Sequence, residues 1–290
     1  MTIILQLLIN ILIPTALFGL IAAGFSIFYA VSRVQHLAIG ASASAAGYTF
    51  FALVRAGVGI PVALFFAILV SIVIGLLCNA LVYERLQKRR WFSSLVALLS
   101  SVMLLLIFQS VLLIIFGSQP KAVPLLSFQQ RFEFFGASLT LIQLIVVPTS
   151  AFFLGILAFY LKRSKIGVAI QATTDNQEVA ELIGINTRRI RYLTMLLASL
   201  AAGLAGVFIA LEFNLEPYAS NLQAIRAFGR TIVGGTGSIA GVIVAGLFID
   251  TAEHVGGFLL TSTYKEIYSF AIVFLFLLFR PQGILGQKRE

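Results

Sequence analysis

Residues 91–120 read WFSSLVALLSSVMLLLIFQSVLLIIFGSQP and contain no Asp, Glu, Lys or Arg. A helix rises about 1.5 Å per residue, so about 20 apolar residues cross the roughly 30 Å hydrocarbon core of a bilayer. Strands of an outer-membrane barrel would instead alternate apolar and polar residues over segments of about ten, and that pattern is absent. The stretch is therefore predicted to be a membrane-spanning helix.

Further charge-free runs extend this pattern over the whole chain, which is 60% hydrophobic and only 11% charged. They cover residues 2–32, 34–54, 56–83, 134–161, 192–211 and 231–249, with a shorter run at 267–279. A soluble core could not absorb so much apolar surface. The first run lacks the basic start of a secretory signal, so it should stay in the membrane. We expect an all-α, polytopic membrane helical bundle of about eight membrane segments, forming one transmembrane domain over residues 1–290.

The net charge of +9 could indicate a nucleic-acid partner, but the basic residues gather at the ends of the apolar runs. This placement is typical of cytoplasmic loops under the positive-inside rule. The clusters are Arg85, Lys88, Arg89 and Arg90; Lys162, Arg163, Lys165, Arg188, Arg189 and Arg191; and Arg280, Lys288 and Arg289. We therefore expect no nucleic acid, a cytoplasmic loop at 162–191, and external segments at 117–133 and 212–223.

The glycine-rich stretch that follows residue 233 bears on the last spans. A basic C-terminus should lie inside, yet two full spans after residue 223 would place it outside. A broken or re-entrant helix would resolve the conflict, and it is tolerated only where it is buried in protein or faces a cavity. Pore lining or close packing is expected for Gly234, Gly235, Gly237, Ser238 and Gly241.

Small residues recur at every fourth position in two of the runs, which lets membrane helices approach closely. These residues are Ala198, Ala202, Gly206 and Ala210 in one run, and Gly237, Gly241 and Ala245 in the other. A bundle packed around a translocation path and ordinary helix packing both fit these stripes.

The loop 162–191 contains a short predicted helix over residues 175–183. Thr174 with Gln177 three residues later fits a capping box, and Gly184 fits the position just beyond the helix end.

The same helix carries an apolar stripe, since Val179, Leu182 and Ile183 follow the spacing i, i+3, i+4. A helix this short is marginal in water, so the stripe should dock on another surface. The surface on which the stripe docks could belong to the chain's own bundle or to another subunit.

Several segments in order resemble the Liv-type permeases, the membrane subunits of branched-chain amino acid ABC importers. These segments are AFGRTIVGGTGSIAG at 227–241, YK at 264–265, FRPQGILG at 279–286, ATTDNQEVAELIGIN at 172–186, and the stretch 90–120. The resemblance implies a permease in a bacterial or archaeal plasma (inner) membrane. Its implied partners are a homologous second permease, two cytoplasmic ATPase subunits and an extracytoplasmic solute-binding protein.

The resemblance also implies that the loop docks on an ATPase subunit. The residues concerned are Asp175, Glu178, Val179, Ala180, Leu182, Ile183 and Gly184. The chain itself has no Gly-x-x-x-x-Gly-Lys-Ser/Thr phosphate loop. ATP and Mg are therefore expected on the partner subunits, and no cofactor on this chain.

One segment departs from the family pattern, because QHLAIGA stands at 35–41 where an Asn-Phe-Ala-x-Gly-Glu type of sequence is usual. His36 occupies the Asn position, Ala41 the acidic position, and Gln171 begins the docking loop where Arg is common. The solute is left open among branched-chain and other amino acids, urea and short organic acids. His36 and Gly40 are candidates for the substrate path, although an interfacial or helix-bonded histidine also fits.

The remaining charged residues admit more than one role. Arg226 and Arg230 could attract a carboxylate-bearing solute or anchor an interface, whereas Asp250 and His254 offer too few ligands for a metal site. No nucleophile–base or paired-carboxylate constellation is present in the sequence, so an enzyme is not expected. The alternative function is a passive channel or an ion-coupled carrier for a small polar solute, whose path usually carries membrane-embedded charges.

Overall fold

The computed structural model describes residues 2–125, 131–134, 137–259, 261–280 and 283–285. Its long elements are α1 (Thr2–Ser32), α2 (Ile39–Arg55), α3 (Ile60–Leu77), α5 (Ser94–Phe116), α6 (Leu141–Arg163), α9 (Thr187–Glu212), α10 (Ala219–Gly234), α11 (Ile239–Leu259) and α12 (Lys265–Phe279). The short elements are a π-helical turn η1 (Cys78–Tyr83), α4 (Glu84–Gln87), β1 (Arg131–Phe134), β2 (Ala137–Thr140), α7 (Lys165–Asp175), α8 (Gln177–Leu182) and a 3₁₀ turn η3 (Ser262–Tyr264).

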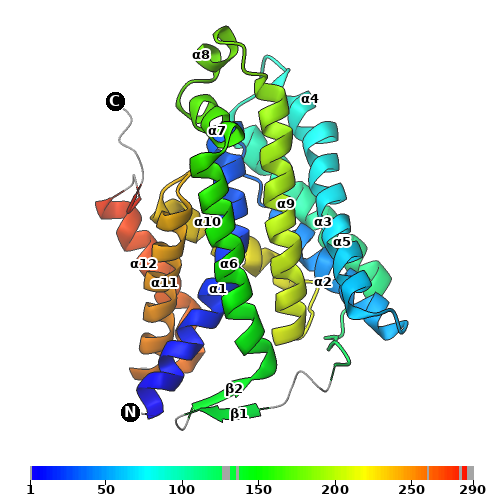
Figure 1. Cartoon of the computed structure of the whole chain (residues 1–290), viewed down its shortest axis with the longest axis vertical. Coiled ribbons are helices and arrows are strands. Elements are labelled where there is room, and N and C mark those ends of the chain that lie inside the picture. The colour runs from blue at the N-terminus through cyan, green and yellow to red at the C-terminus, as the bar shows by residue number, and fades with distance from the viewer. Residues whose placement is uncertain (1, 126–130, 135–136, 260, 281–282, 286–290) are drawn as a thin grey trace.

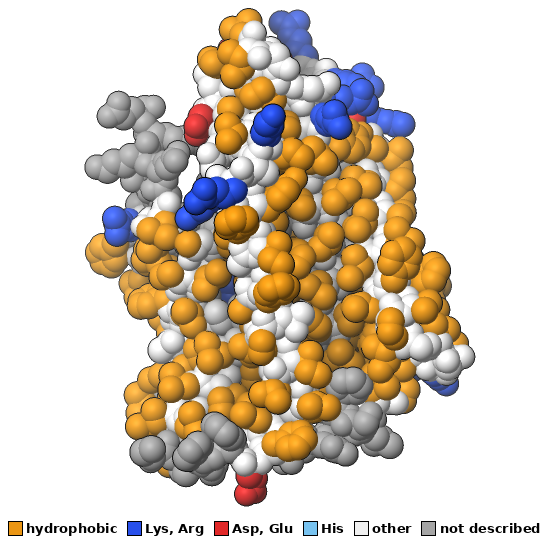
Figure 2. Space-filling view, viewed as in Figure 1, with side chains coloured by type: hydrophobic (Ala, Val, Ile, Leu, Met, Phe, Trp, Pro, Cys, Tyr) orange, Lys and Arg blue, Asp and Glu red, His pale blue; other side chains and the backbone are white. Residues whose placement is uncertain are grey.

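The long helices lie side by side along the molecule, with α7, α8 and the C-terminus at one end and the N-terminus at the other (Figure 1). Lys and Arg side chains gather at the end that carries α7 and α8, while the flank between the ends is mostly hydrophobic (Figure 2). By the positive-inside rule this end is cytoplasmic. Within the described ranges, seven helices are long and apolar enough to cross a membrane. The prediction of a polytopic helical bundle is confirmed.

Two strands depart from the all-α expectation. β1 pairs with β2 as a small antiparallel hairpin at the outer end, and the Ser138 amide donates to Gln6 Oε1 at 3.0 Å. The hairpin leads into α6, whose first turn is held by a capping box between Thr140 and Gln143. Residues 131–133 lie in the segment predicted to be external, whereas residues 134–140 were predicted to begin a membrane span, so the span starts later than expected, at Leu141.

The predicted span at 231–249 is wrong, because α10 and α11 are two antiparallel helices that meet at a turn over residues 235–238. The glycine-rich stretch is therefore not a break inside one helix. Arg226 and Arg230 lie within α10, so its sequence contains no charge-free run long enough to indicate a membrane helix. Residues 219–223, predicted to be part of an external segment, instead form the first turn of α10. With α10 counted, the chain returns to the cytoplasmic end after α12, as the basic C-terminus requires.

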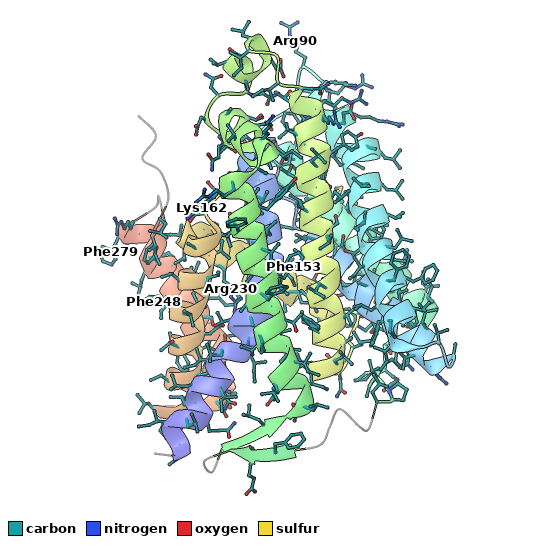
Figure 3. The ribbon with its side chains drawn as sticks, viewed as in Figure 1. Arg90, Phe153, Lys162, Arg230, Phe248 and Phe279 are labelled. Carbon is teal, nitrogen blue, oxygen red and sulfur yellow. The ribbon has the colours of Figure 1, made fainter. Side chains whose placement is uncertain are left out.

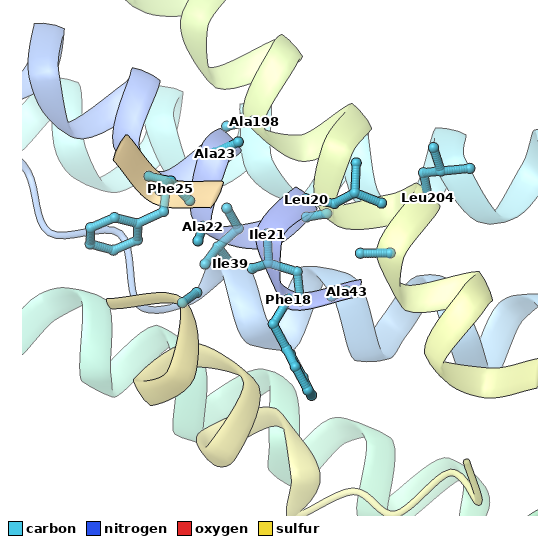
Figure 4. Close-up of a cluster of buried hydrophobic side chains, with 14 of the residues drawn as sticks. Phe18, Leu20, Ile21, Ala22, Ala23, Phe25, Ile39, Ala43, Ala198 and Leu204 are labelled. Atoms are coloured by element: carbon cyan, nitrogen blue, oxygen red, sulfur yellow. The ribbon is translucent and has the colours of Figure 1, made fainter. Parts of the chain in front are cut away.

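The core forms where α9 packs against α1, α2 and α3. A methyl group on Gly206 would overlap the carbonyl group of Ala43, and one on Gly24 would lie 2.8 Å from the carbonyl oxygen of Ala198. Backbones this close require small residues, which confirms packing as the role of the α9 stripe. Ala198 and Ala43 belong to a larger buried cluster on α1, α2 and α9 (Figure 4).

A charged network joins α10 to α11 inside the bundle. The Arg230 guanidinium, fully buried, pairs with the buried Asp250 carboxylate, which also accepts a 2.7 Å hydrogen bond from Thr15 on α1. One turn away, Arg226 pairs with Glu253 at 3.2 Å, and Glu253 accepts from Ser269 on α12. Figure 3 shows Arg230 midway along the bundle.

Removing one member of the central pair should destabilise the protein more than removing both. Arg230→Met or Asp250→Leu leaves one buried charge unpaired, which typically costs about 3–5 kcal/mol, whereas an apolar replacement of the whole pair is often near neutral. Thermal unfolding in detergent should rank wild type and the double variant above both single variants.

Lys88→Met is the control for this series, because the Lys88 side chain is exposed and Glu84 keeps Arg188 and Tyr192 as partners when Lys88 is removed. It should unfold close to the wild-type temperature. A double variant less stable than both single variants would show that the pair stabilises the fold by more than mutual neutralisation.

Candidate functional site

The cytoplasmic segment between α6 and α9 is built from short capped helices. Ser164 Oγ accepts from the Gly167 amide at 2.9 Å and starts α7. Asn176 then ends α7, and its side chain accepts from the amides of Glu178 and Val179 at 3.0 and 3.1 Å, which starts α8. The predicted capping box at Thr174 and Gln177 is wrong, since an asparagine two residues later caps the helix.

The end of α8 matches the prediction at Gly184, which has a left-handed φ of +88°. The Ile185 amide donates to the Ala180 carbonyl at 2.9 Å, and the Gly184 amide donates to that of Glu181 at 3.0 Å. This pair of bonds defines a Schellman motif, which needs a residue that tolerates positive φ. The helix thus covers Gln177–Leu182, not the predicted 175–183.

The apolar stripe of α8 faces away from the bundle. Val179, Leu182 and Ile183 are 51%, 85% and 68% exposed, while Ala180 is buried. α8 lies beyond α7 at the tip of the cytoplasmic end (Figure 1). The chain's own bundle therefore does not cover this stripe, which was one of the two surfaces left open by the sequence.

The segment is nevertheless anchored to the bundle. Ile170 of α7 packs with Val31 of α1 and Ile190 of α9. Beside α8, hydrogen bonds donated by Thr187 and Gln177 hold the pKa of Glu181 below its ordinary value. A displacement of α8 would thus be transmitted through α7 to α1 and α9.

A cavity of about 890 Å³ opens between the end of α1, the end of α6, α7 and the turn between α10 and α11. Gly235, Gly237 and Ser238 line it, and the Gly237 amide donates to Ser26 Oγ of α1 at 2.8 Å. Gly237 has a φ of +85°, so the turn needs glycine there.

The other two residues of the predicted glycine set pack against each other. A methyl group on Gly234 would lie 2.5 Å from the carbonyl carbon of Gly241. The set thus divides between the two expected roles, with Gly234 and Gly241 in close helix contact and Gly235, Gly237 and Ser238 at a cavity.

The two candidates for the substrate path do not line this cavity. His36 is buried between the rings of Phe28 and Tyr83, and its Nδ1 lies 2.8 Å from the Tyr83 hydroxyl. Gly40 is buried where α2 meets α10, with Ser220 so close that a side chain would overlap its carbonyl. Both are core residues in this structure, where a path would need them exposed to a cavity.

Sequence reasoning missed how the charged residues combine. The spacings of Arg226 with Arg230 and of Asp250 with Glu253 can be read from the sequence. Only the antiparallel packing of α10 on α11 brings the two pairs together. His254 Nδ1 contacts the Asp250 carbonyl at 2.9 Å, and in the described part of the chain no group of three or more potential metal ligands occurs.

Gly241→Leu should lower the yield of folded protein, because its side chain would overlap the Gly234 carbonyl. Gly237→Leu should do the same through its positive φ. Size-exclusion chromatography in mild detergent would measure both. Val244→Leu, on the exposed face of α11, is the matched control and should behave as wild type; monodisperse glycine variants at wild-type yield would contradict the packing argument.

Comparison with known proteins supplies the family. The family model of the branched-chain amino acid transport system permease component matches residues 7–279. The permease LivH of Salmonella typhimurium is 29% identical over 93% of this chain and 91% of its own length, and BraD of Pseudomonas aeruginosa is 28% identical over 98% and 96%. Both are named high-affinity branched-chain amino acid transport system permease proteins.

Among solved structures, PsaBC from Streptococcus pneumoniae in complex with Fab aligns with a TM-score of 0.52 at 15% identity, covering 96% of this chain and 93% of that one. At this identity the likeness concerns the fold alone. The family match covers nearly the whole chain, and the basic end, the membrane helices and the cytoplasmic segment agree with it. This chain is a multi-pass membrane protein and belongs to the family of permease components of branched-chain amino acid transport systems.

Proposed function

We propose that this chain is the permease of an ATP-driven importer of branched-chain or closely related amino acids, and that α8 is its contact with an ATPase subunit. The observation that carries the proposal is the exposed apolar stripe of α8 at the cytoplasmic end. Relatives named for branched-chain amino acid transport support the choice of solute.

The stripe favours a protein partner in the cytoplasm. Burying a side chain of the size of Leu182 stabilises a contact by roughly 1.5–3 kcal/mol, and three such residues lie together on α8. The caps of α8 hold it folded before docking, which lowers the entropy lost on binding. A rigid, capped helix with an uncovered apolar face suits a groove on an ATPase subunit.

The proposed assembly follows the general arrangement of ABC transporters. A second permease would pair with this chain, two ATPase subunits would bind at the cytoplasmic end, and a solute-binding protein would deliver solute at the outer end. ATP and Mg would bind to the ATPase subunits. The setting is the bacterial or archaeal plasma membrane.

A channel or ion-coupled carrier is less favoured. Such proteins usually place ionisable side chains along the permeation path. Here the charges inside α10 and α11 pair with each other, and Arg230 with Asp250 is fully buried. These charges hold helices together, which leaves the driving force to partner subunits.

Leu182→Asp should abolish ATP-driven uptake without preventing membrane insertion, because a charged group cannot enter an apolar groove unpaired. Co-purification of the ATPase subunits and uptake of radiolabelled L-leucine into proteoliposomes would measure both steps. Glu181→Gln is the control, since glutamine still accepts the hydrogen bonds of Thr187 and Gln177. Normal ATPase binding and uptake by Leu182→Asp would remove α8 from the coupling route.

The chain reconstituted alone should neither hydrolyse ATP nor conduct ions, because it lacks a phosphate-binding loop. Co-reconstitution with its ATPase subunits, second permease and binding protein should restore ATP-dependent leucine uptake. ATPase activity or ion conductance of the isolated chain would refute the permease assignment.

A further inference from the structure

The helix that begins as α3 does not end at the edge of the hydrocarbon core. α3, η1 and α4 form one continuous helical span over Ile60–Gln87, which has 28 residues. At about 1.5 Å per residue, a helix crosses the roughly 30 Å hydrocarbon core in about 20 residues. The last turn of this span, at α4, therefore extends into the layer of lipid headgroups on the cytoplasmic side.

One face of this span changes from apolar to basic where it leaves the core. Large apolar side chains are exposed at every third or fourth residue along this face, and they are Val62, Phe66, Leu69, Val73, Leu77 and Leu81. The next exposed residue at this spacing is Arg85, and Lys88 and Arg89 follow it by three and four residues. A lipid whose acyl chain covers the apolar stripe would thus place its headgroup at these basic side chains.

The opposite face of α4 is fixed to the bundle. Glu84 is buried and accepts hydrogen bonds from Tyr192 at 2.6 Å and from Arg188 at 3.2 Å, both on α9. Gln87 donates to the Ser32 carbonyl at the end of α1 at 3.1 Å. A helix of four residues is not stable by itself, so these contacts hold α4 with its basic face outward.

The basic face carries more positive charge than the protein neutralises. Arg85, Lys88, Arg89 and Arg90 lie within six residues, and we call them the α4 cluster. Among the described residues, Glu84 is the only acidic residue that forms an ion pair with this cluster, and it does so through Lys88. The three arginines of the cluster are exposed, and Figure 3 shows Arg90 at the cytoplasmic end. They are available to an anionic partner.

Two observations favour a lipid over an acidic protein surface as that partner. The cluster continues directly from an apolar stripe that faces lipid, whereas the exposed stripe of α8 lies at the tip of the cytoplasmic end (Figure 1). Trp91 directly follows the cluster and is exposed, and tryptophan is enriched at the level of lipid headgroups. The cluster therefore lies where phospholipid headgroups are.

We propose that the α4 cluster binds an anionic phospholipid of the cytoplasmic leaflet, with the phosphate at Arg85 and Arg89 and an acyl chain along Leu77 and Leu81. Guanidinium groups match the geometry of phosphate oxygens. Bound lipid would also relieve the repulsion between Arg85 and Arg89, since like charges four residues apart destabilise a helix. The site lies outside the solute path and α8, so it does not depend on the function proposed above.

Trp91 makes the proposal directly measurable, because it is the only tryptophan of the chain. The full chain is reconstituted in phosphatidylcholine vesicles with an increasing fraction of lipid brominated on its acyl chains, which quenches tryptophan on contact. The brominated lipid is either phosphatidylglycerol or phosphatidylcholine with identical chains. Each basic residue near the membrane surface favours an anionic lipid by about five-fold. Phosphatidylglycerol should therefore quench Trp91 at a several-fold lower mole fraction than phosphatidylcholine.

Substitutions assign the preference to the cluster. Arg85→Gln and Arg89→Gln should each lower the preference for phosphatidylglycerol several-fold, and the double variant should remove it. Arg163→Gln is the matched control, because it removes the same charge from an exposed position at the end of α6 and should keep the preference. Leu81→Trp in a Trp91→Phe background places a second reporter on the apolar stripe.

The other outcomes overturn the lipid site. Equal quenching by the two brominated lipids at both reporters contradicts it, and loss of ATPase co-purification in the double arginine variant would then assign the cluster to the ATPase contact. An equal loss of preference in Arg163→Gln would show general surface charge and no site. Relief of quenching by inorganic phosphate, beyond that of chloride at the same ionic strength, would indicate a site for a free anion.

Discussion

The ion pair between Arg230 and Asp250 determines how the C-terminal half of the molecule is arranged. Both side chains are fully buried, and isolated charges at membrane depth are costly, so each requires the other. Thr15 and the ring of Phe18 complete the pair from α1. With Arg226 and Glu253 one turn away, the pair allows α10 and α11 only one antiparallel register.

That register also determines where the glycines and the turn of the α10–α11 pair lie. Gly234 meets Gly241 because the two helices are held at this alignment, and their backbones can then approach as closely as side-chain-free residues permit. The turn at residues 235–238 consequently falls at the cytoplasmic end, where Ser26 of α1 accepts from the Gly237 amide. The pair in the middle of the membrane therefore sets the position of a cytoplasmic cavity wall.

The opposite wall of that cavity belongs to the segment that carries α8. Asn176 both ends α7 and starts α8, so the two helices are joined by one residue and respond together. A partner bound to the exposed stripe of α8 would act on the cavity through α7, which is packed on α1 and α9. Coupling in this sense needs two states with different contacts at α8. The geometry supplies a short physical route between the exposed stripe of α8 and the cavity.

Hydropathy, charge placement and turn chemistry determined much of this protein without a structure. Bilayer thickness sets the length of an apolar helix, the positive-inside rule sets its direction, and a glycine just beyond Leu182 marks where α8 ends. The small residues of α9 likewise signalled close helix contact. The segments in family order also pointed to the permease family.

Only the tertiary structure decided what depends on contacts between distant residues. The sequence did not predict α10, because Arg226 and Arg230 make it too charged for a typical span. Their partners Glu253 and Asp250 lie on the next helix, α11, and only the fold brings them close. His36 and Gly40 looked functional from their place in a motif, yet neighbours from α3–η1 and α10 enclose them in the core. A local pattern shows which polar residues would be unfavourable to bury. The partners that offset this unfavourable burial are distant in sequence and become neighbours only on folding.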